Sequence, residues 1–256
     1  MTAQTFEFHG ARGDRLEGKL DLPDGQPQGW AILAHCFTYG NDSRAANRLA
    51  SALAARGIGV LRFHFAGLVN SGRSFTDTTF AADVEDLVAA GDAMTRDGKS
   101  PSILIGHSLG GAAVLMAAGE MPGILAAATL GAPFDVRHVL QQLELQSSHT
   151  VDTRGDAEVL LADRPLAVRQ SFFGDLTRRE MASRIARLRI PLLVLHSPLD
   201  EVVDIENAAH IFTVAMHPKS FISLDNADHF LSGRADADYA AARISIWASR
   251  CRDAER

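Results

Sequence analysis

The sequence predicts an α/β fold: a mostly parallel sheet with helices on both faces, in one domain that spans residues 1–256. Short apolar runs of strand length alternate along the chain with stretches of helical periodicity, which is typical of parallel strands joined by crossover helices. At residues 104–111 one such strand passes through a glycine-rich turn directly into a helix. The length also suffices for one large hydrophobic core.

The first half of the chain is expected to start with a pair of strands, since two strand-like runs flank a glycine-containing turn at 10–13. Apolar runs and helical stretches then alternate, and Gly57 is expected to end the first helix. In order, we expect strands at 5–9, 16–22 and 30–35, a helix at 43–56, a strand at 59–65 and a helix at 80–94.

The second half continues this alternation with one interruption. Residues 134–188 break the rhythm, and the sequence predicts there a small cap inserted between two core strands. Within the cap we expect a helix near 138–143 and a short strand or hairpin at 158–161. The core elements of this half are strands at 102–105, 124–130, 190–196 and 220–224, and helices at 109–121 and 204–216.

Residues 106–110 have the form Gly-x-Ser-x-Gly, with Ser108 at the apex of the strand-to-helix turn. A nucleophile in such a turn has a strained backbone, and side chains at Gly106 and Gly110 would clash there. The N-terminus of the following helix favours negative charge beside the hydroxyl. The pattern predicts Ser108 as a nucleophile; the alternative is a serine that only caps the helix.

A serine hydroxyl needs a base to take its proton and a carboxylate to orient that base. Asp200 follows an apolar strand on a loop at the carboxyl end of the sheet, where open α/β sheets place their sites. His229 lies in the loop after the next strand. The order Ser108, Asp200, His229 therefore predicts a catalytic triad.

Three other aspartates near these loops are alternatives for the acid. Asp204 is expected to cap the helix at 204–216 and is the weaker candidate. Asp225 remains a backup acid. Asp228 is adjacent to His229, and neighbouring side chains on an extended loop point apart, so we do not expect it to orient the ring.

The strand ending at His35 leads into a loop that should stand beside the nucleophile turn. Hydrolytic sites of this type take one oxyanion donor from this loop and the other from the residue after the serine, so we expect the N–H groups of Phe37 and Leu109 to form the oxyanion hole. His35, Cys36 and His107 are placed at the substrate pocket, with His35 bracing the loop and His107 supporting the turn.

The chain resembles the α/β-hydrolase superfamily over most of its length, through the motifs at 35–37, 106–111, 196–200 and 227–229. Within it, the segments 34–38, 131–134, 164–165 and 217–221 resemble the hydrolase portion of bacterial bifunctional α/β-hydrolase/OsmC-type proteins. The resemblance implies an α/β-hydrolase fold and esterase activity. Because this chain ends at Arg256, we expect neither an OsmC-like domain nor its thiol-peroxidase function.

The loops around the pocket depart from the family pattern. His64 stands where an aspartate is usual, Val69-Asn70 where a glycine is usual, and Cys36 replaces the glycine of the commoner oxyanion loop. These changes leave the triad intact and concern the substrate. Phe172 and Phe173 in the cap are expected either to line the acyl pocket or to pack the cap onto the sheet, and both interpretations stay open.

Composition and charge exclude other classes. The net charge of −6 and the lack of a long basic run indicate no nucleic-acid partner. No membrane span or signal peptide is apparent, and two reduced cysteines fit a cytoplasmic protein better than one disulfide. No spacing indicates a metal or cofactor. A cluster of arginines is expected on the solvated face of an amphipathic helix rather than at an anion site: Arg178, Arg179, Arg184, Arg187 and Arg189.

The sequence thus predicts a serine hydrolase, a carboxylesterase for small to medium acyl esters that forms an acyl-enzyme on Ser108. The partner is a small-molecule ester, and a homodimer is left open. The rivals are a thioesterase or other acyl or C–C hydrolase on the same triad, and a non-catalytic ligand-binding member of the fold.

Overall fold

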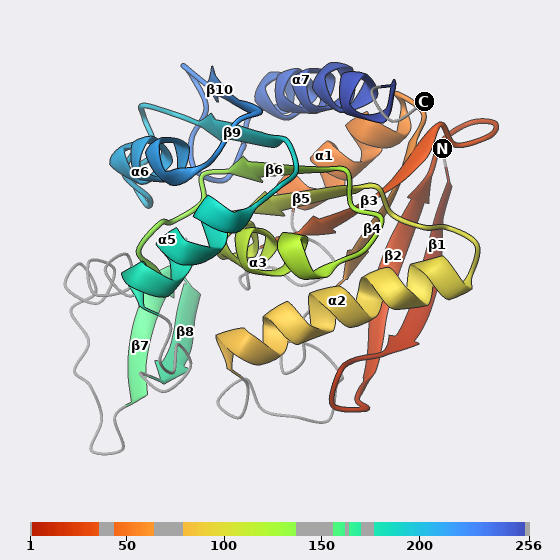
Figure 1. The fold of residues 1–256 in the computed structure, drawn as a ribbon, viewed down its shortest axis with the longest axis horizontal. Helices are drawn as coiled ribbons and strands as arrows, with labels where there is room; N and C mark the ends of the chain where they lie inside the picture. The colour runs from red at the N-terminus through yellow and green to blue at the C-terminus, as the bar shows by residue number, and fades with distance from the viewer. Residues whose placement is uncertain are drawn as a thin grey trace.

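The computed structural model describes residues 2–35, 44–63, 79–136, 156–161, 164–169 and 177–253. They form a sheet of eight strands in the order β1-β2-β4-β3-β5-β6-β9-β10 (Figure 1). The strands are β1 (Thr2–His9), β2 (Arg15–Leu22), β3 (Gly29–Ala34), β4 (Ile58–Phe63), β5 (Ile103–His107), β6 (Ala126–Leu130), β9 (Leu192–His196) and β10 (Lys219–Ser223).

Six neighbouring strands, from β4 to β10, pair in parallel. At the other edge β1 and β2 form an antiparallel pair, and β2 joins the sheet antiparallel to β4. The carboxyl ends of the six parallel strands therefore all lie along the same edge of the sheet, which runs across the strands. The loops after β5 and β9, which carry Ser108 and Asp200, meet at this edge.

Helices cover both faces of the sheet (Figure 1). On one face, α1 (Arg44–Ala54) packs against α7 (Arg234–Asp253), and both contribute to one hydrophobic cluster. On the other face a second cluster unites α2 (Phe80–Arg96), α3 (Leu109–Ala117), α5 (Arg178–Arg187) and α6 (Glu206–Val214). The mostly parallel sheet with helices on both faces is the fold class that the sequence predicts.

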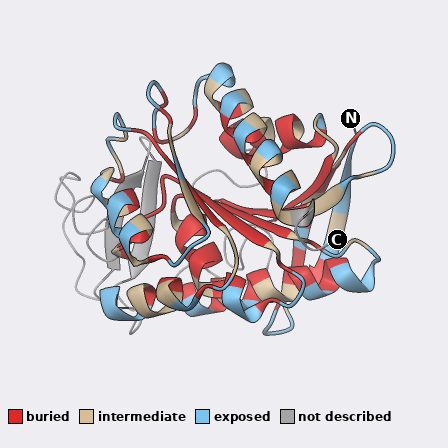
Figure 2. Cartoon of the chain, turned by 45° about the horizontal axis from the view of Figure 1, so that its top comes forward, coloured by how far each residue is buried: buried red, intermediate tan, exposed pale blue. Residues whose placement is uncertain are grey.

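The central strands are buried on both faces, so they are continuous apolar runs rather than alternating ones. Every residue of β4, β5, β6 and β9 is buried. Figure 2 shows this as red strands between helices whose outer surfaces are pale blue. This continuous burial explains why short apolar segments located the core strands in the sequence.

The structure extends the expected elements in two places. A 20-residue helix, α7, follows the loop that carries His229, and the sequence analysis assigned no element there. Of the short strand or hairpin expected at 158–161, the structure has the hairpin, formed by β7 (Asp156–Leu161) and β8 (Arg164–Arg169). No helix among the described ranges is long and apolar enough to cross a membrane.

Part of the expected cap, residues 134–188, is described. Its last helix, α5, buries Met181 and Ile185 in the hydrophobic cluster shared with α2, α3 and α6, while its arginines are exposed or half-buried. The predicted amphipathic helix is therefore present, but it ends at Arg187, so Arg189 of the predicted cluster lies beyond it. The helix expected near 138–143, and Phe172 and Phe173, lie outside the described residues.

Candidate active site

Ser108 occupies the turn between β5 and α3 with a backbone conformation that non-glycine residues rarely adopt. Its φ is 55° and its ψ is −128°, and such strain is concentrated at functional sites. Its N–H donates to the carbonyl of Leu130 on the neighbouring strand, at 2.8 Å. The hydroxyl makes no capping hydrogen bond to α3, so the capping alternative does not describe this side chain.

The two glycines of the turn allow close backbone contacts, as expected. A Cβ at Gly106 would lie 2.5 Å from the carbonyl oxygen of Gly110 and 2.5 Å from the Cα of Gly111. A Cβ at Gly110 would lie 2.4 Å from the carbonyl oxygen of Ala34, at the end of β3. The first glycine thus lets the turn close on itself, and the second lets α3 start against the neighbouring strand.

The structure brings Ser108, His229 and Asp200 into one chain of hydrogen-bond distances. Ser108 Oγ lies 3.0 Å from His229 Nε2, and His229 Nδ1 lies 2.8 Å from Asp200 Oδ2. Ser108 is 7% exposed and His229 is 4% exposed. In this arrangement Nδ1–H donates to the carboxylate, which leaves the Nε2 lone pair directed at the hydroxyl.

Both carboxylate oxygens of Asp200 have partners, and the loop after β9 holds one of them. While Oδ2 faces His229, Oδ1 accepts hydrogen bonds from the backbone N–H of Val202 at 2.9 Å and of Val203 at 2.8 Å. Burial raises the pKa of Asp200, but the hydrogen bond and charge of His229 and these two N–H groups outweigh burial, so its pKa is lowered overall. Asp200 is therefore ionised over the range in which His229 titrates.

The other aspartates make different contacts. Asp204 Oδ1 accepts from the N–H of Glu206 at 2.7 Å, at the start of α6. Asp225 is hydrogen-bonded to the hydroxyl of Ser223. Asp228 Oδ1 accepts from the N–H of Ser232 at 2.8 Å. Of these four aspartates, Asp200 is the one that contacts His229 Nδ1.

The surroundings of His229 favour its neutral form. Burial lowers the pKa of His229, the hydrogen bond that it donates to Asp200 raises it, and His107 and His196 lower it, with a net shift below the ordinary value. The His107 ring lies 5.1 Å from the His229 ring, and His107 Nε2 donates to the backbone carbonyl of His229 at 2.7 Å. His107 thus contacts the backbone of His229, whereas the sequence analysis expected it to support the turn at Ser108.

Gly131 is part of the site that sequence reasoning did not assign. It follows β6 with a φ of +53°, and a Cβ there would lie 3.0 Å from Asp200 Oδ2 and 3.3 Å from His229 Nδ1. The absence of a side chain leaves room for the contact between acid and base. A glycine directly after a core strand, at the edge that carries Ser108 and Asp200, is the signal that could have identified it.

The remaining predicted residues lie at the same edge or outside the described part. Leu109 opens α3, and helix N-terminal N–H groups have no acceptor within the helix. His35 is buried just after β3. Cys36 and Phe37, and with them the second expected oxyanion donor, lie outside the described residues.

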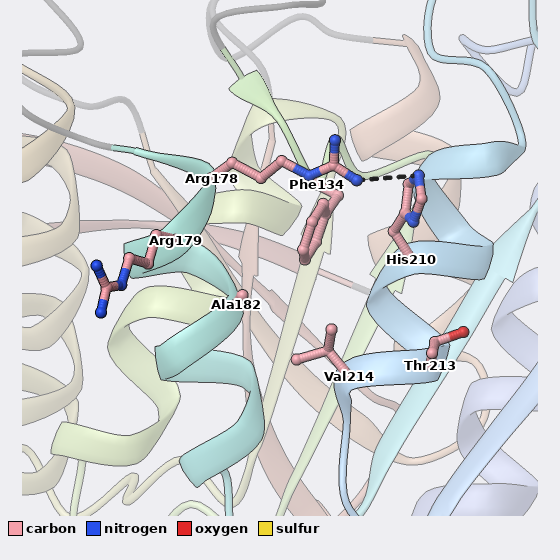
Figure 3. Close-up of a pocket in the computed structure, with 7 residues that line it drawn as sticks. All are labelled: Phe134, Arg178, Arg179, Ala182, His210, Thr213 and Val214. Carbon is pink, nitrogen blue, oxygen red and sulfur yellow. Dashed lines mark hydrogen bonds between the residues drawn. The ribbon is translucent and has the colours of Figure 1, made fainter.

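A surface groove of about 490 Å³ lies between α5 and α6 (Figure 3). Phe134, which follows β6, stands between the two helices. The Arg178 guanidinium lies 5.3 Å from the Phe134 ring centre and donates to His210 Nε2 at 3.2 Å. Arg179 points away from Phe134 in Figure 3. The groove therefore has an apolar wall and two arginines among its lining residues, a feature that the sequence analysis did not predict.

The comparisons with known proteins agree with this architecture. A family model described as "Alpha/beta hydrolase family" matches residues 31–242. The esterase domain of a Rhodothermus marinus protein is 43% identical, with a TM-score of 0.80, and the match covers 98% of this chain and 99% of that one. No curated protein matches the chain.

Two more distant structures share the fold alone. Est1E from Butyrivibrio proteoclasticus, solved with ferulic acid bound, is 18% identical with a TM-score of 0.74, over 95% of this chain and 98% of that one. XC6422 from Xanthomonas campestris, described as a serine hydrolase without lid, is 18% identical with a TM-score of 0.65, over 96% and 95%. Because the family model matches more than half of the chain and the 43% identical Rhodothermus marinus domain matches nearly all of it, the chain belongs to the α/β-hydrolase family.

Proposed function

We propose that this chain is a serine hydrolase that cleaves small to medium carboxylic esters through an acyl-enzyme on Ser108. The observation that carries the proposal is the unbroken series of contacts from Ser108 Oγ to His229 Nε2 at 3.0 Å and from His229 Nδ1 to Asp200 Oδ2 at 2.8 Å. The esterase domain at 43% identity supports esters as the substrate class.

In the acylation step, His229 Nε2 takes the proton of Ser108 as Oγ attacks the ester carbonyl. Asp200 holds the ring in the tautomer that presents Nε2 and stabilises the imidazolium that forms. The tetrahedral intermediate collapses, the bond to the leaving alcohol breaks, and the imidazolium returns its proton to that alcohol. The acyl group then remains on Ser108 Oγ.

In the deacylation step, water replaces the alcohol. His229 takes a proton from the water, which attacks the acyl carbonyl, and the imidazolium then protonates Ser108 Oγ as the carboxylic acid leaves. The N–H of Leu109 at the start of α3 and that of Phe37 are assigned to the oxyanion in both steps. Each such donor contributes on the order of 10²-fold in rate.

The strained turn also supports Ser108 as the reacting group. A hydroxyl that caps no helix N–H and faces a buried, neutral imidazole is arranged for proton transfer rather than for local stability. The likeness to hydrolase portions of OsmC-linked proteins remains a prediction from the sequence motifs, and it concerns the chain's context rather than its chemistry.

The test compares Ser108→Ala with Ser102→Ala in the hydrolysis of p-nitrophenyl acetate. Ser108→Ala should lower kcat by at least about 10³-fold. Ser102 is a matched control, because its hydroxyl is buried near the start of the same strand without a hydrogen-bond partner in the described region. A fluorophosphonate probe should label Ser108 in the unaltered protein and in Ser102→Ala. Retention of a large fraction of turnover in Ser108→Ala, or labelling at another serine alone, contradicts the proposal.

A panel of substrates then assigns the leaving group. Esters of increasing acyl length, the matching thioesters and a peptide-bond substrate should be hydrolysed with the highest kcat/KM among the short and medium esters. A thioester preferred over its oxygen ester by tenfold or more would contradict the ester assignment while leaving the nucleophile unchanged.

A further inference from the structure

His196, the last residue of β9, contacts the loop that carries Asp200. Its Nε2 lies 2.8 Å from the carbonyl oxygen of Val203, which is a hydrogen bond, and 3.5 Å from Asp200 Oδ2, which is too long for a strong one. Because a carbonyl oxygen only accepts, Nε2 carries the proton and donates to Val203. The imidazole is thus committed to the acid loop and not to the substrate side of the site.

Burying this imidazole lowers the stability of the fold. Its side chain has no solvent exposure, and its Nδ1 is buried without a hydrogen-bond partner in the described part of the chain. A buried acceptor without a partner is destabilising, and such a group in a native structure calls for an explanation. The other residues of β9 are leucines and a valine, so an aliphatic side chain suits this strand. The hydrogen bond to Val203 is what the imidazole adds.

Val203 is held at both of its backbone polar groups. Its N–H donates to Asp200 Oδ1 at 2.8 Å, and its carbonyl accepts from His196 at 2.8 Å. His196 itself is fixed by the sheet, since it pairs with Ser223 of β10 and its carbonyl accepts from the N–H of Leu224. The contacts therefore tie a loop that carries the acid to a rigid strand.

We infer that His196 is a positioning residue for hydrolysis: through Val203 it fixes the loop that aims Asp200 Oδ2 at His229 Nδ1. This inference rests on the proposed function, because it concerns the orientation of the base. It assigns His196 no contact with the substrate and no proton transfer. Its effect is on kcat, since the same triad geometry is needed in acylation and deacylation, while substrate binding does not involve this buried side of Asp200.

The first experiment removes the donor and then restores it. His196→Leu should lower kcat for p-nitrophenyl acetate about tenfold per active site, with KM within twofold of the unaltered value. Active sites are counted by fluorophosphonate labelling, so a loss of folded protein alone would leave kcat per site unchanged. His196→Gln, whose amide nitrogen reaches about as far as Nε2, should recover kcat to within about threefold. An unchanged kcat per site in His196→Leu overturns the inference.

The control is Thr129→Val on the neighbouring strand β6. Thr129 is fully buried, and its hydroxyl has no hydrogen-bond partner in the described region. It therefore resembles His196 as a buried polar residue of the sheet, and it pairs with Val194 within β9 rather than with the acid loop. Its kcat per site should stay within twofold, and a tenfold loss there would show that any polar change in the sheet slows the reaction.

A double-mutant cycle tests the route through Asp200. In an Asp200→Asn background, His196→Leu should lower kcat by no more than about twofold further, because the loop no longer delivers a carboxylate. A full tenfold loss in both backgrounds overturns the positioning role. This outcome is distinct from failure of the proposed function, which would appear as turnover retained in Ser108→Ala.

If His196→Leu does not fold, His196→Asn and His196→Gln repeat the comparison with two polar side chains. The side chain of asparagine is too short for its amide nitrogen to reach the Val203 carbonyl, whereas the side chain of glutamine is long enough. His196→Gln should exceed His196→Asn in kcat per site by at least about threefold. Equal values in the two variants overturn the inference.

Discussion

Replacing Gly131 by alanine is expected to slow catalysis while leaving the protein folded. The added Cβ would lie 3.0 Å from Asp200 Oδ2 and 3.3 Å from His229 Nδ1. Non-bonded heavy atoms prefer about 3.5 Å or more, so the carboxylate has to move by a few tenths of an ångström. The hydrogen bond between acid and base, now 2.8 Å, then approaches about 3.2 Å, where such bonds weaken.

The expected loss in rate follows from this displacement. A misplacement of about 1 Å can lower a rate about 10²-fold, so a few tenths of an ångström should lower kcat about threefold to tenfold. A second effect acts on stability, because Gly131 has a φ of +53°. A non-glycine residue in this conformation costs about 1–2 kcal/mol in free energy of unfolding.

Gly98→Ala separates these two effects. Gly98 also has a positive φ, +72°, but a Cβ there would meet nothing within 4 Å. Both variants should lose about 1–2 kcal/mol in urea unfolding, and Gly131→Ala alone should lose kcat per labelled active site with p-nitrophenyl acetate. If kcat of Gly131→Ala equals that of Gly98→Ala within twofold, the added methyl group does not disturb the acid and base.

Two further predictions concern pH. Burial is the main reason why the pKa of His229 is lowered, so the neutral base persists to lower pH. We therefore expect kcat/KM to fall only below about pH 6.5. An acid limb of the pH–rate profile centred above pH 7 would contradict this. Burial, and then Asp86, raise the pKa of Asp83 well above its ordinary value, against a smaller lowering by Arg12. Stability is then lost as the pH rises from the ordinary carboxyl range through the raised value, so Asp83→Asn should raise Tm more at pH 8 than at pH 5. Equal changes in Tm at both values, by differential scanning calorimetry, would count against a raised pKa.

The core strands could be predicted from the sequence because each is a local pattern. In a parallel sheet covered on both faces, a strand such as β9 is a run of five buried residues, and its apolar character is visible without knowledge of its neighbours. The helix α7 was missed for the opposite reason. Its buried residues are mainly alanines between charged residues, a weak hydrophobic signal whose burial depends on the close packing of α1.

The assignment of the acid shows a second limit of prediction from sequence. Asp200, Asp204 and Asp225 all follow strands and all suit a loop at the edge of the sheet. Asp200 faces His229 because β9 and β10 are neighbours in parallel register and because the loop after β9 folds its N–H groups onto Oδ1. Neither the register nor the turn is contained in the spacing of the aspartates.

The sequence by itself determined the kind of turn that presents Ser108, because the glycines that permit it lie within five consecutive residues. It also determined which histidine and which few carboxylates could serve it. Only the tertiary structure decided the partners, since the base lies 121 residues from the serine and the acid lies 29 residues from the base. Contacts over such separations depend on which strands are adjacent and on where their loops turn, and these are properties of the packed sheet as a whole.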